Sequence, residues 1–307
     1  MKTYDFKTFS QMTLDLIFKG MNRMPSPGEE VFSQEFMMQL GGGPTVIPIV
    51  LKSLGKKTAL GTFWGEDEES KLCVHLMKSL GFTNYTNFYS TIERGKGKNP
   101  LVVSCVFSWD RDRGFVTRND EVCEESLPEE TVYQYLKDAK VVFAPKGHFE
   151  VTKRLHEEGS IIVSDTGWKD DLNIKDFVKM LSFVDVFTPN DKEAMKMTET
   201  TSVEEALKVL GQYTRLPIVT MGSRGCAWME NNTLRFSEAI SFPKSIDTTG
   251  AGDNFLAGVI YGILTSDKIS NWLKLGNIFA GYSTTGLGCY QSMVTGDIIR
   301  QYYPGKL

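Results

Sequence analysis

The sequence predicts an α/β fold, a three-layer sandwich in which a mostly parallel central sheet lies between two layers of helices, with a small β lid beside it. Three observations predict this architecture. From about residue 126 onward, helical and strand patterns alternate regularly, which is typical of a parallel sheet covered on both faces. Near the start of the chain, strand patterns follow one another with no helix between them. A third stretch, residues 101–117, is predicted to be a hairpin around the turn residues 110–114.

The first half of the chain is divided between the two sheets. Residues 5–17 are interpreted as one strand with Asp15 near its carboxyl end, the end at which open α/β sheets bind ligands. The lid is predicted from about residues 16–40 and 90–118, inside a single domain that spans residues 1–307. For the central layers, the patterns predict helices at 45–54 and 70–80, the first ended by Gly55, and a strand at 57–64.

The second half of the chain supplies the regular alternation. Most of its strands are followed by a helix, and the last two strands form a hairpin around Asn231 and Asn232. The predicted strands are 140–144, 160–165, 184–188, 216–220, 226–230 and 233–236. The predicted helices are 127–138, 150–158, 173–182, 191–198, 203–212, 254–264, 269–286 and 295–303.

Composition limits the functional classes. Hydrophobic residues make up 41% and charged residues 23% of the chain, as in an ordinary globular protein. The net charge of −4 argues against a nucleic-acid-binding protein. No apolar run reaches the roughly 18 residues of a membrane-spanning helix, and the first residues lack a signal-peptide core, so we expect a cytoplasmic protein without a membrane partner. The five scattered cysteines and three histidines predict neither a zinc site nor a disulfide framework.

The segment Asp247-Thr248-Thr249-Gly250-Ala251-Gly252-Asp253 leads directly into an apolar helix. The first N–H groups of a helix have no partner within it and carry partial positive charge. Gly250, Ala251 and Gly252 would let an anion approach these groups, so the segment predicts a phosphate-binding site. Asp253 would stand ionised beside that phosphate, as a weak base for a hydroxyl that attacks it. Capping aspartates around a tight glycine turn are the alternative interpretation.

Asn190 and Glu193 open another predicted helix directly after a strand. Residues three apart share one face of the first turn, and amide and carboxylate oxygens suit Mg²⁺. A capping box, Asn-x-x-Glu, is the alternative interpretation. Two further glycine-rich stretches stand at strand ends: Gly41-Gly42-Gly43 before a helix, and Thr220-Met221-Gly222-Ser223-Arg224-Gly225.

In chain order, the glycine motif at 41–43, Asn-x-x-Glu at 190–193, Thr-x-Gly at 220–222 and the segment 247–253 resemble the motifs of the ribokinase (phosphofructokinase-B type) family of carbohydrate kinases. The resemblance covers essentially the whole chain and implies a ribokinase-like fold. It also implies an ATP-dependent kinase that phosphorylates a hydroxyl of a small sugar. Asp253 would be the catalytic base, and the amides of Gly250, Ala251 and Gly252 would stabilise the transferring phosphoryl group. Mg²⁺ would lie near Asn190 and Glu193, through water, and bridge the ATP phosphates.

The remaining roles also follow from the resemblance. The nucleotide would contact Thr220, Gly222, Gly225 and Asn277. The sugar would contact Asp15, Gly41, Gly42 and Gly43. A monovalent cation such as K⁺, which many relatives hold, would lie near Asp247, Thr249, Ser283, Gly286, Gly288 and Ser292. Relatives often dimerise through the lid, so a homodimer is expected.

The sequence departs from the family pattern mainly around the acceptor. Val46 stands where ribokinases usually carry asparagine, Gly43 where they often carry lysine, and Thr13 where another asparagine is common. Ser10 replaces a glycine, and the family's Asp-x-Asn appears as Asp165-Thr166-Gly167. Ribose is therefore in doubt as the substrate. A nucleoside kinase of the same fold and a non-catalytic sugar-binding descendant remain open. A Rossmann dehydrogenase and a P-loop kinase are excluded because their glycine motifs are missing.

Overall fold

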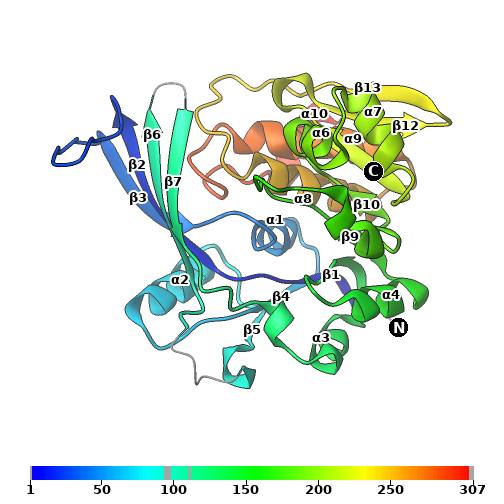
Figure 1. The fold of residues 1–307 in the computed structure, drawn as a ribbon, viewed down its shortest axis with the longest axis horizontal. Helices are drawn as coiled ribbons and strands as arrows, with labels where there is room; N and C mark the ends of the chain where they lie inside the picture. The colour runs from blue at the N-terminus through cyan, green and yellow to red at the C-terminus, as the bar shows by residue number, and fades with distance from the viewer. Residues whose placement is uncertain (1, 93–97, 110–111, 304–307) are drawn as a thin grey trace.

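The computed structural model describes residues 2–92, 98–109 and 112–303, and Figure 1 shows two sheets of unequal size. In the described residues the larger sheet has nine strands in the order β13-β12-β11-β10-β9-β8-β1-β4-β5. Its strands are parallel from β5 to β11. At the other edge, β12 runs antiparallel to both of its neighbours, β11 and β13. They are β1 (Tyr4–Phe9), β4 (Thr58–Thr62), β5 (Tyr85–Asn87), β8 (Ala139–Phe143), β9 (Ile161–Ser164), β10 (Val186–Phe187), β11 (Leu216–Thr220), β12 (Cys226–Glu230) and β13 (Thr233–Ser237).

The smaller sheet has four strands in the order β3-β2-β6-β7 and stands to one side of the molecule. We call it the lid sheet. It consists of β2 (Thr13–Met21), β3 (Glu35–Leu40), β6 (Val102–Trp109) and β7 (Asp112–Arg118). The expected separate small sheet is confirmed, although it begins at Thr13. The turn predicted at residues 110–114 is shorter than expected because β7 begins at Asp112, and residues 110–111 lie outside the described residues.

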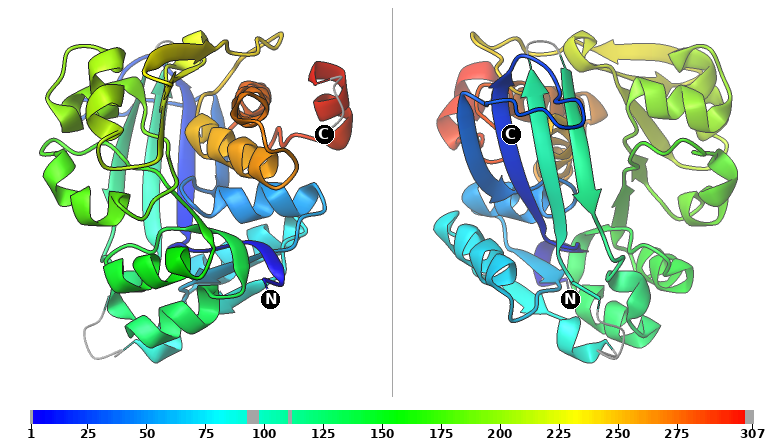
Figure 2. Two further views of the ribbon diagram at one scale, coloured as in Figure 1. Left: turned by 90° about the vertical axis from the view of Figure 1, so that its right-hand side faces the viewer. Right: turned by 60° about the vertical axis from the view of Figure 1, so that its left-hand side comes forward.

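Helices cover both faces of the larger sheet, as Figure 2 shows from two further sides. One core lies between the sheet and α1, α2, α8, α9 and α10, and it contains Phe6 and Phe279. The other lies between the opposite face and α3 to α7, and it contains Phe9 and Leu207. The helices are α1 (Val46–Ser53), α2 (Glu68–Ser79), α3 (Glu129–Leu136), α4 (Phe149–Glu157), α5 (Val178–Leu181), α6 (Asp191–Thr198), α7 (Val203–Leu210), α8 (Ala251–Ile263), α9 (Ile269–Ser283) and α10 (Gly296–Tyr302).

The prediction of one strand over residues 5–17 is wrong. Strand β1 ends at Phe9 in the larger sheet, where the N–H of Ser10 still donates to the carbonyl of Gly61. The chain then crosses to the lid sheet, and the carbonyl of Met12 accepts from the N–H of Val102. Asp15 therefore lies in a lid strand and not at the carboxyl end of a central strand. Strand-forming residues stand on both sides of the crossing, so the sequence pattern alone did not reveal the break.

The helix predicted at 173–182 is also wrong in its extent. A 3₁₀ turn at Ile174–Asp176, capped by the side chain of Asn173, precedes the four-residue helix α5. Bonds between residues three apart, from the N–H of Phe177 to Ile174 and from that of Val184 to Leu181, replace the α-helical pattern. The segment therefore forms a compact surface connection in place of a long helix. Strand β5, at Tyr85–Asn87, was not predicted. The other helices and strands differ from expectation by a few residues at their ends.

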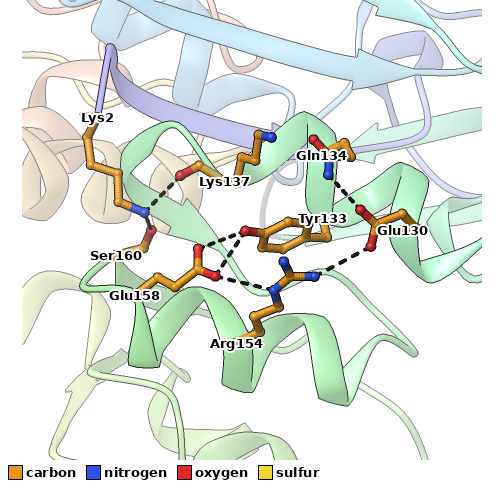
Figure 3. A network of polar contacts seen from close by, with 8 residues as sticks. All are labelled: Lys2, Glu130, Tyr133, Gln134, Lys137, Arg154, Glu158 and Ser160. Atoms are coloured by element: carbon orange, nitrogen blue, oxygen red, sulfur yellow. Dashed lines mark hydrogen bonds and ion pairs between the residues drawn. The ribbon is translucent and has the colours of Figure 1, made fainter.

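A polar network stabilises the edge of the larger sheet at which the parallel strands begin (Figure 3). The hydroxyl of Tyr133 donates to the carboxylate of Glu158 at 2.9 Å, and Arg154 pairs with the same carboxylate. Lys2, before β1, donates to the hydroxyl of Ser160, before β9, at 2.7 Å. These contacts join α3, α4 and two strand starts. Ligands bind at the opposite edge in such sheets, so this network has a structural role.

Two expectations from composition concern the whole chain. No disulfide joins the five cysteines in the described structure, and four of them are buried while Cys105 is half-buried. Among the described residues, no helix is long and apolar enough to cross a membrane.

Candidate active site

The segment 247–253 lies where a loop enters α8, as expected. Gly250 is the N-cap residue and has φ of +70°, a conformation that glycine adopts without strain. A side chain there would also collide with Cys289, whose Sγ would lie 2.5 Å from the added Cβ. The amide of Asn254, fully buried, donates to the carbonyls of Gly250 and Cys289 and so fixes the helix start against that loop. Sequence reasoning did not single out Asn254, because its partner is 35 residues away.

Asp253 is the third residue of α8, and its carboxylate meets the first glycine motif of the chain. Its Oδ2 accepts the N–H of Gly43 at 2.9 Å, a contact between residues 210 apart in sequence. A Cβ on Gly42 would lie 2.8 Å from the same oxygen, so only glycine allows this approach. The glycine motif and the segment 247–253, predicted separately, are therefore brought together.

The surroundings of Asp253 raise the pKa of its carboxyl. Part of the residue is open to solvent, but its carboxyl lies among protein atoms, and this desolvation raises its pKa to about 6. The hydrogen bond from Gly43 opposes the rise. The role of Asp253 as a weak, ionised base stays a prediction.

The backbone amides at the start of α8 are only partly available to an anion. The N–H of Ala251 donates to the carbonyl of Thr248 at 3.2 Å. Within the described structure, the N–H groups of Gly252 and Asp253 donate to no protein acceptor. The predicted contribution of the Ala251 amide is thus weakened, whereas Gly252 fits the predicted role.

A cavity of about 330 Å³ opens at this helix start, and we call it the nucleotide-side cavity. It gathers six predicted residues from separate segments: Thr220, Gly222, Gly225, Ala251, Gly252 and Asn277. The amide of Asn277 donates to the backbone and side-chain oxygens of Ser237, at 3.1 and 2.9 Å, so its donors already hold β13 against α9. A contact between Asn277 and a nucleotide stays a prediction.

Asn190 and Glu193 form the capping box that was the alternative interpretation. Asn190 Oδ1 accepts the N–H of Glu193 at 2.9 Å, and Glu193 Oε2 accepts the N–H of Asn190 at 3.0 Å. The pair still lies beside the nucleotide-side cavity, because the N–H of Thr220 donates to the carbonyl of Pro189 at 3.0 Å. Burial raises the pKa of Glu193. Capping and water-mediated metal binding are compatible, so the metal role stays a prediction.

Asp165 is a site residue that sequence reasoning missed, having noted it only as a departure from a family motif. It follows β9 at the carboxyl edge of the sheet. Burial, with the charges of Asp253 and Glu193 nearby, raises its pKa well above its ordinary value. Its position directly after a parallel strand was the signal that could have identified it.

The carboxylates of Asp165, Glu193 and Asp253 influence one another electrostatically, and a divalent cation near them stays a prediction. Mg²⁺ is commonly bound by one or two carboxylates together with waters and substrate phosphates. In the described part of the chain no group of three or more His, Cys, Asp or Glu residues forms a metal site by itself. The arrangement therefore suits a metal that arrives with the nucleotide.

The residues predicted to hold a monovalent cation are only partly brought together. Asp247 Oδ1 accepts from the N–H and the hydroxyl of Thr249, at 2.9 and 2.8 Å, and Oδ2 accepts the N–H of Gly288 at 2.7 Å. Gly286 packs against Ser292. The hydroxyl of Ser283, in contrast, donates to the carbonyl of Ala280 inside α9. The cation site stays a prediction.

Asp15 projects from the lid sheet toward the glycine motif. It is 5% exposed, and a Cβ on Gly41 would lie 2.8 Å from its Oδ1. Burial, with Asp247 as the nearest like charge, raises the pKa of Asp15 to about 6. Tyr290, which the sequence did not point to, fixes the motif from behind, since its hydroxyl donates to the carbonyl of Gly41 at 3.1 Å.

A second cavity, of about 710 Å³, opens on the other side of Gly42 and Gly43. We call it the acceptor-side cavity. The carboxyl ends of β1, β8 and β9 form its floor, and Thr13 and Val102 of the lid segment form a wall. Val46 was expected to influence the substrate, but it is fully buried and is absent from the residues described as lining this cavity. Asp15 is also absent from that lining, so the influence of Val46 on the substrate stays a prediction.

Known proteins resemble this chain over nearly its whole length. Residues 8–295 match the family described as pfkB family carbohydrate kinase. The ribokinase of Lactococcus lactis subsp. lactis (strain IL1403) is 25% identical over 297 residues, which cover 92% of this chain and 91% of that protein. The ribokinase structure from Thermotoga maritima has a TM-score of 0.79 at 18% identity and covers 98% of this chain and 100% of its own. The nucleoside kinase structure from Methanocaldococcus jannaschii has a TM-score of 0.76 at 16% identity, with 99% of each chain covered.

The two structural likenesses confirm the expected ribokinase-like α/β fold. The family match extends from β1 to the loop before α10 and includes both glycine motifs and the start of α8. The chain belongs to the pfkB family of carbohydrate kinases.

Proposed function

We propose that this protein transfers the γ-phosphate of ATP to a hydroxyl of a small sugar or sugar derivative. One observation carries the proposal: the carboxylate of Asp253 touches the Gly42-Gly43 turn. Gly42 and Gly43 line the acceptor-side cavity, and Gly252, the residue before Asp253, lines the nucleotide-side cavity. A proton acceptor at this boundary is what a direct transfer from nucleotide to hydroxyl requires.

The chain's own residues supply binding and orientation for the phosphoryl group. The N–H of Gly252, together with the positive end of α8, would hold the transferring oxygens. Thr248 and Thr220 stand on the same cavity wall, where hydroxyls can bind the remaining phosphates. Positioned donors of this kind provide most of the catalysis in phosphoryl transfer.

Asp253 would accept the proton of the attacking hydroxyl. Because its pKa is about 6, it is mostly ionised at neutral pH and still basic enough to take a proton late in the reaction. The N–H of Gly43 holds the carboxylate in place. Mg²⁺, held through water near Asn190, Glu193 and Asp165, would neutralise phosphate charge. K⁺ at the Asp247 loop would be a further, structural ion.

On the acceptor side, Asp15 has the chemistry of a hydroxyl-binding group. It is buried, and no hydrogen bond or ion pair to its carboxylate is found in the described structure. An unpartnered buried carboxylate is costly, and a bound sugar hydroxyl would remove that cost. Closure of the lid sheet over the sugar would exclude water and so limit hydrolysis of ATP.

The assay that tests this function measures ADP formation with a panel of sugars, sugar derivatives and nucleosides, and identifies the phosphorylated product. We expect sugar-dependent turnover in the wild type. Asp253→Asn keeps an oxygen for the N–H of Gly43, so it should fold, but kcat should fall by about 10²–10⁴-fold. Turnover within about tenfold of wild type would refute the role of Asp253. Phosphorylation of nucleosides alone would refute the sugar acceptor.

We also propose that the protein forms a homodimer through the outer face of its lid sheet, the face opposite Asp15. Phe36, Met38 and Val116 are 53%, 47% and 63% exposed on this face. An exposed apolar patch on a small sheet with free edges favours association with another copy.

A further inference from the structure

The acceptor-side cavity is the larger of the two cavities of the candidate site. At about 710 Å³ it has about twice the volume of the nucleotide-side cavity, at about 330 Å³. It extends from Gly42 and Gly43 to residues before α4 and α5, so an acceptor has room to reach beyond the contact with Asp253.

Much of the acceptor-side cavity lies away from Asp253. The near end of the cavity is formed by Gly42 and Gly43, which touch Asp253. The far end is formed by Glu124, by His148 before α4, and by Phe177 before α5. An acceptor that fills the cavity would place one part beside Asp253 and a second part against this far wall.

Glu124 is the notable group of the far wall. Its side chain is only 9% exposed, and burial raises its pKa. One carboxylate oxygen, Oε1, accepts the N–H of Lys146 at 3.2 Å, and the backbone N–H of Glu124 itself also interacts with the carboxylate. The ammonium of Lys146 is taken by another residue, since it pairs with Glu125 at 2.8 Å. The imidazole of His148 donates to the carbonyl of Glu124 at 2.6 Å and so fixes this segment.

A carboxylate that lines a cavity can accept further hydrogen bonds, and sugar hydroxyls are suitable donors. A phosphate group would be a poor partner because it carries the same charge. The cavity as a whole has charged residues of both signs in similar number: Glu121, Glu124, Asp165 and Asp176 are acidic, and Lys146, Lys169 and Lys179 are basic. Such a lining favours a neutral ligand over an anionic one. The aromatic side chains of Phe149 and Phe177 add apolar surface of the kind that covers the face of a ring.

We propose that the acceptor of this kinase is a neutral glycoside of two linked sugar rings, whose far ring donates hydroxyl hydrogen bonds to Glu124. The near ring presents the reacting hydroxyl to Asp253. The chemical step is the transfer already described: the hydroxyl proton passes to Asp253, an O–P bond forms, the bond between the γ-phosphorus and the bridging oxygen breaks, and ADP leaves. This inference rests on the proposed function and names its substrate class.

The first test uses the wild-type protein and compares disaccharides with their component monosaccharides, sugar phosphates and nucleosides, at saturating MgATP. We expect kcat/KM for the preferred disaccharide to exceed that for its components by about tenfold or more. A monosaccharide that is phosphorylated equally well would overturn the two-ring inference and leave the proposed function intact. A clear preference for a sugar phosphate or a nucleoside would also overturn it. Absence of transfer to every acceptor would overturn the proposed function as well.

The second test uses Glu124→Gln, with Glu125→Gln as the matched control. Glutamine keeps the shape and the bond from Lys146 but weakens hydroxyl binding, so KM for the disaccharide should rise about tenfold while kcat changes less. The monosaccharide and ATP constants should stay within about threefold. Glu125 is exposed and carries only the ion pair to Lys146, so its variant should match wild type.

An equal loss for both acceptor sizes would show that Glu124 is merely structural. Should Glu124→Gln fail to fold, the wild-type comparison still decides the acceptor size.

Discussion

Two aspartates in different elements, Asp15 in β2 of the lid sheet and Asp253 in α8, have similar surroundings. Each is removed from water, and each has its pKa raised from an ordinary value of 3.8 to about 6. Such groups disfavour the folded protein at neutral pH relative to neutral side chains of the same shape. Buried carboxylates with raised pKa values at a cavity are typical of functional sites. At a purely structural position, an amide side chain would serve equally well.

The raised pKa of Asp253 predicts the pH dependence of the reaction. The base must be ionised, so activity is present above the folded-state pKa and is lost as the pH falls through about 6. Below that value, kcat/KM for the acceptor should decline roughly tenfold per pH unit if Asp253 alone matters. Asp15, with a similar pKa and with Asp247 nearby, would steepen the decline if its ionised form binds the sugar. The measurement is a pH series at saturating MgATP, for wild type and Asp15→Asn. A profile that stays level from about pH 5 to 8 would contradict the role of Asp253.

At the scale of the elements, α8 has two kinds of glycine. Gly252, in the first turn, has no atom within 4 Å of an added Cβ and lines the nucleotide-side cavity. Gly258, further along, lets α9 approach: its added Cβ would lie 2.6 Å from the carbonyl oxygen of Leu275 and 2.8 Å from Cα of Gly276. One glycine therefore leaves room for a ligand, and the other for a helix.

Alanine substitutions should separate these two roles. Gly258→Ala forces α8 and α9 apart, and we expect the free energy of unfolding to fall by about 1–3 kcal/mol. Gly252→Ala should leave stability unchanged or raise it by up to about 1 kcal/mol, because alanine favours a helix. Its methyl group would hinder the approach of phosphate, so we expect KM for ATP to rise or kcat to fall by about tenfold. Denaturant unfolding and steady-state kinetics on both variants check this. A fully active Gly252→Ala protein would show that its backbone is not closely approached.

The sequence predicted the elements of the second half well because there each local pattern agrees with its surroundings. Helix α6, at 191–198, and strand β11, at 216–220, have the expected bounds, and Asn231 and Asn232 adopt the positive φ values of a tight hairpin turn. Prediction failed where contacts between distant residues determine the course of the chain. The crossing after Phe9 is set by pairing with Gly61 and Val102. Periodicity carries no information about which sheet a strand joins.

The candidate site shows the same division. Glycine motifs and the segment 247–253 could be recognised because their chemistry needs particular residues at fixed spacing. The far wall of the acceptor-side cavity could not, because Glu124, His148 and Phe177 are distant in sequence and belong to no motif. Cavity volume and the burial of a single carboxylate are properties of the assembled chain. The substrate is therefore the part of the function that sequence motifs leave open.

At the scale of the whole molecule, the lid sheet is covered differently on its two faces. Its inner face carries Asp15 toward the site, whereas on the outer face α2 packs near one end and leaves the rest uncovered. Phe18 contacts both Phe36 and Phe107 on that outer face, with ring centroids 5.0 and 5.8 Å apart. Strands β3 and β7 are the edges of this sheet. A second copy related by a twofold axis would cover the same face of both chains, the commonest arrangement of homo-oligomers.

The dimer predicts a specific response to charge on the outer face. A glutamate in place of Met38, which is 47% exposed, would be desolvated twice in a twofold interface, once in each chain. Met38→Glu should therefore convert the dimer to a monomer in light scattering or sedimentation, with little change in the melting temperature of each chain. Phe236→Glu is the matched control, because Phe236 is 59% exposed on β13, at the far edge of the larger sheet. If both variants keep the mass of the wild type, the lid sheet is not the interface. If the wild type is itself a monomer at all concentrations, the lid must close over the acceptor without help from a second copy.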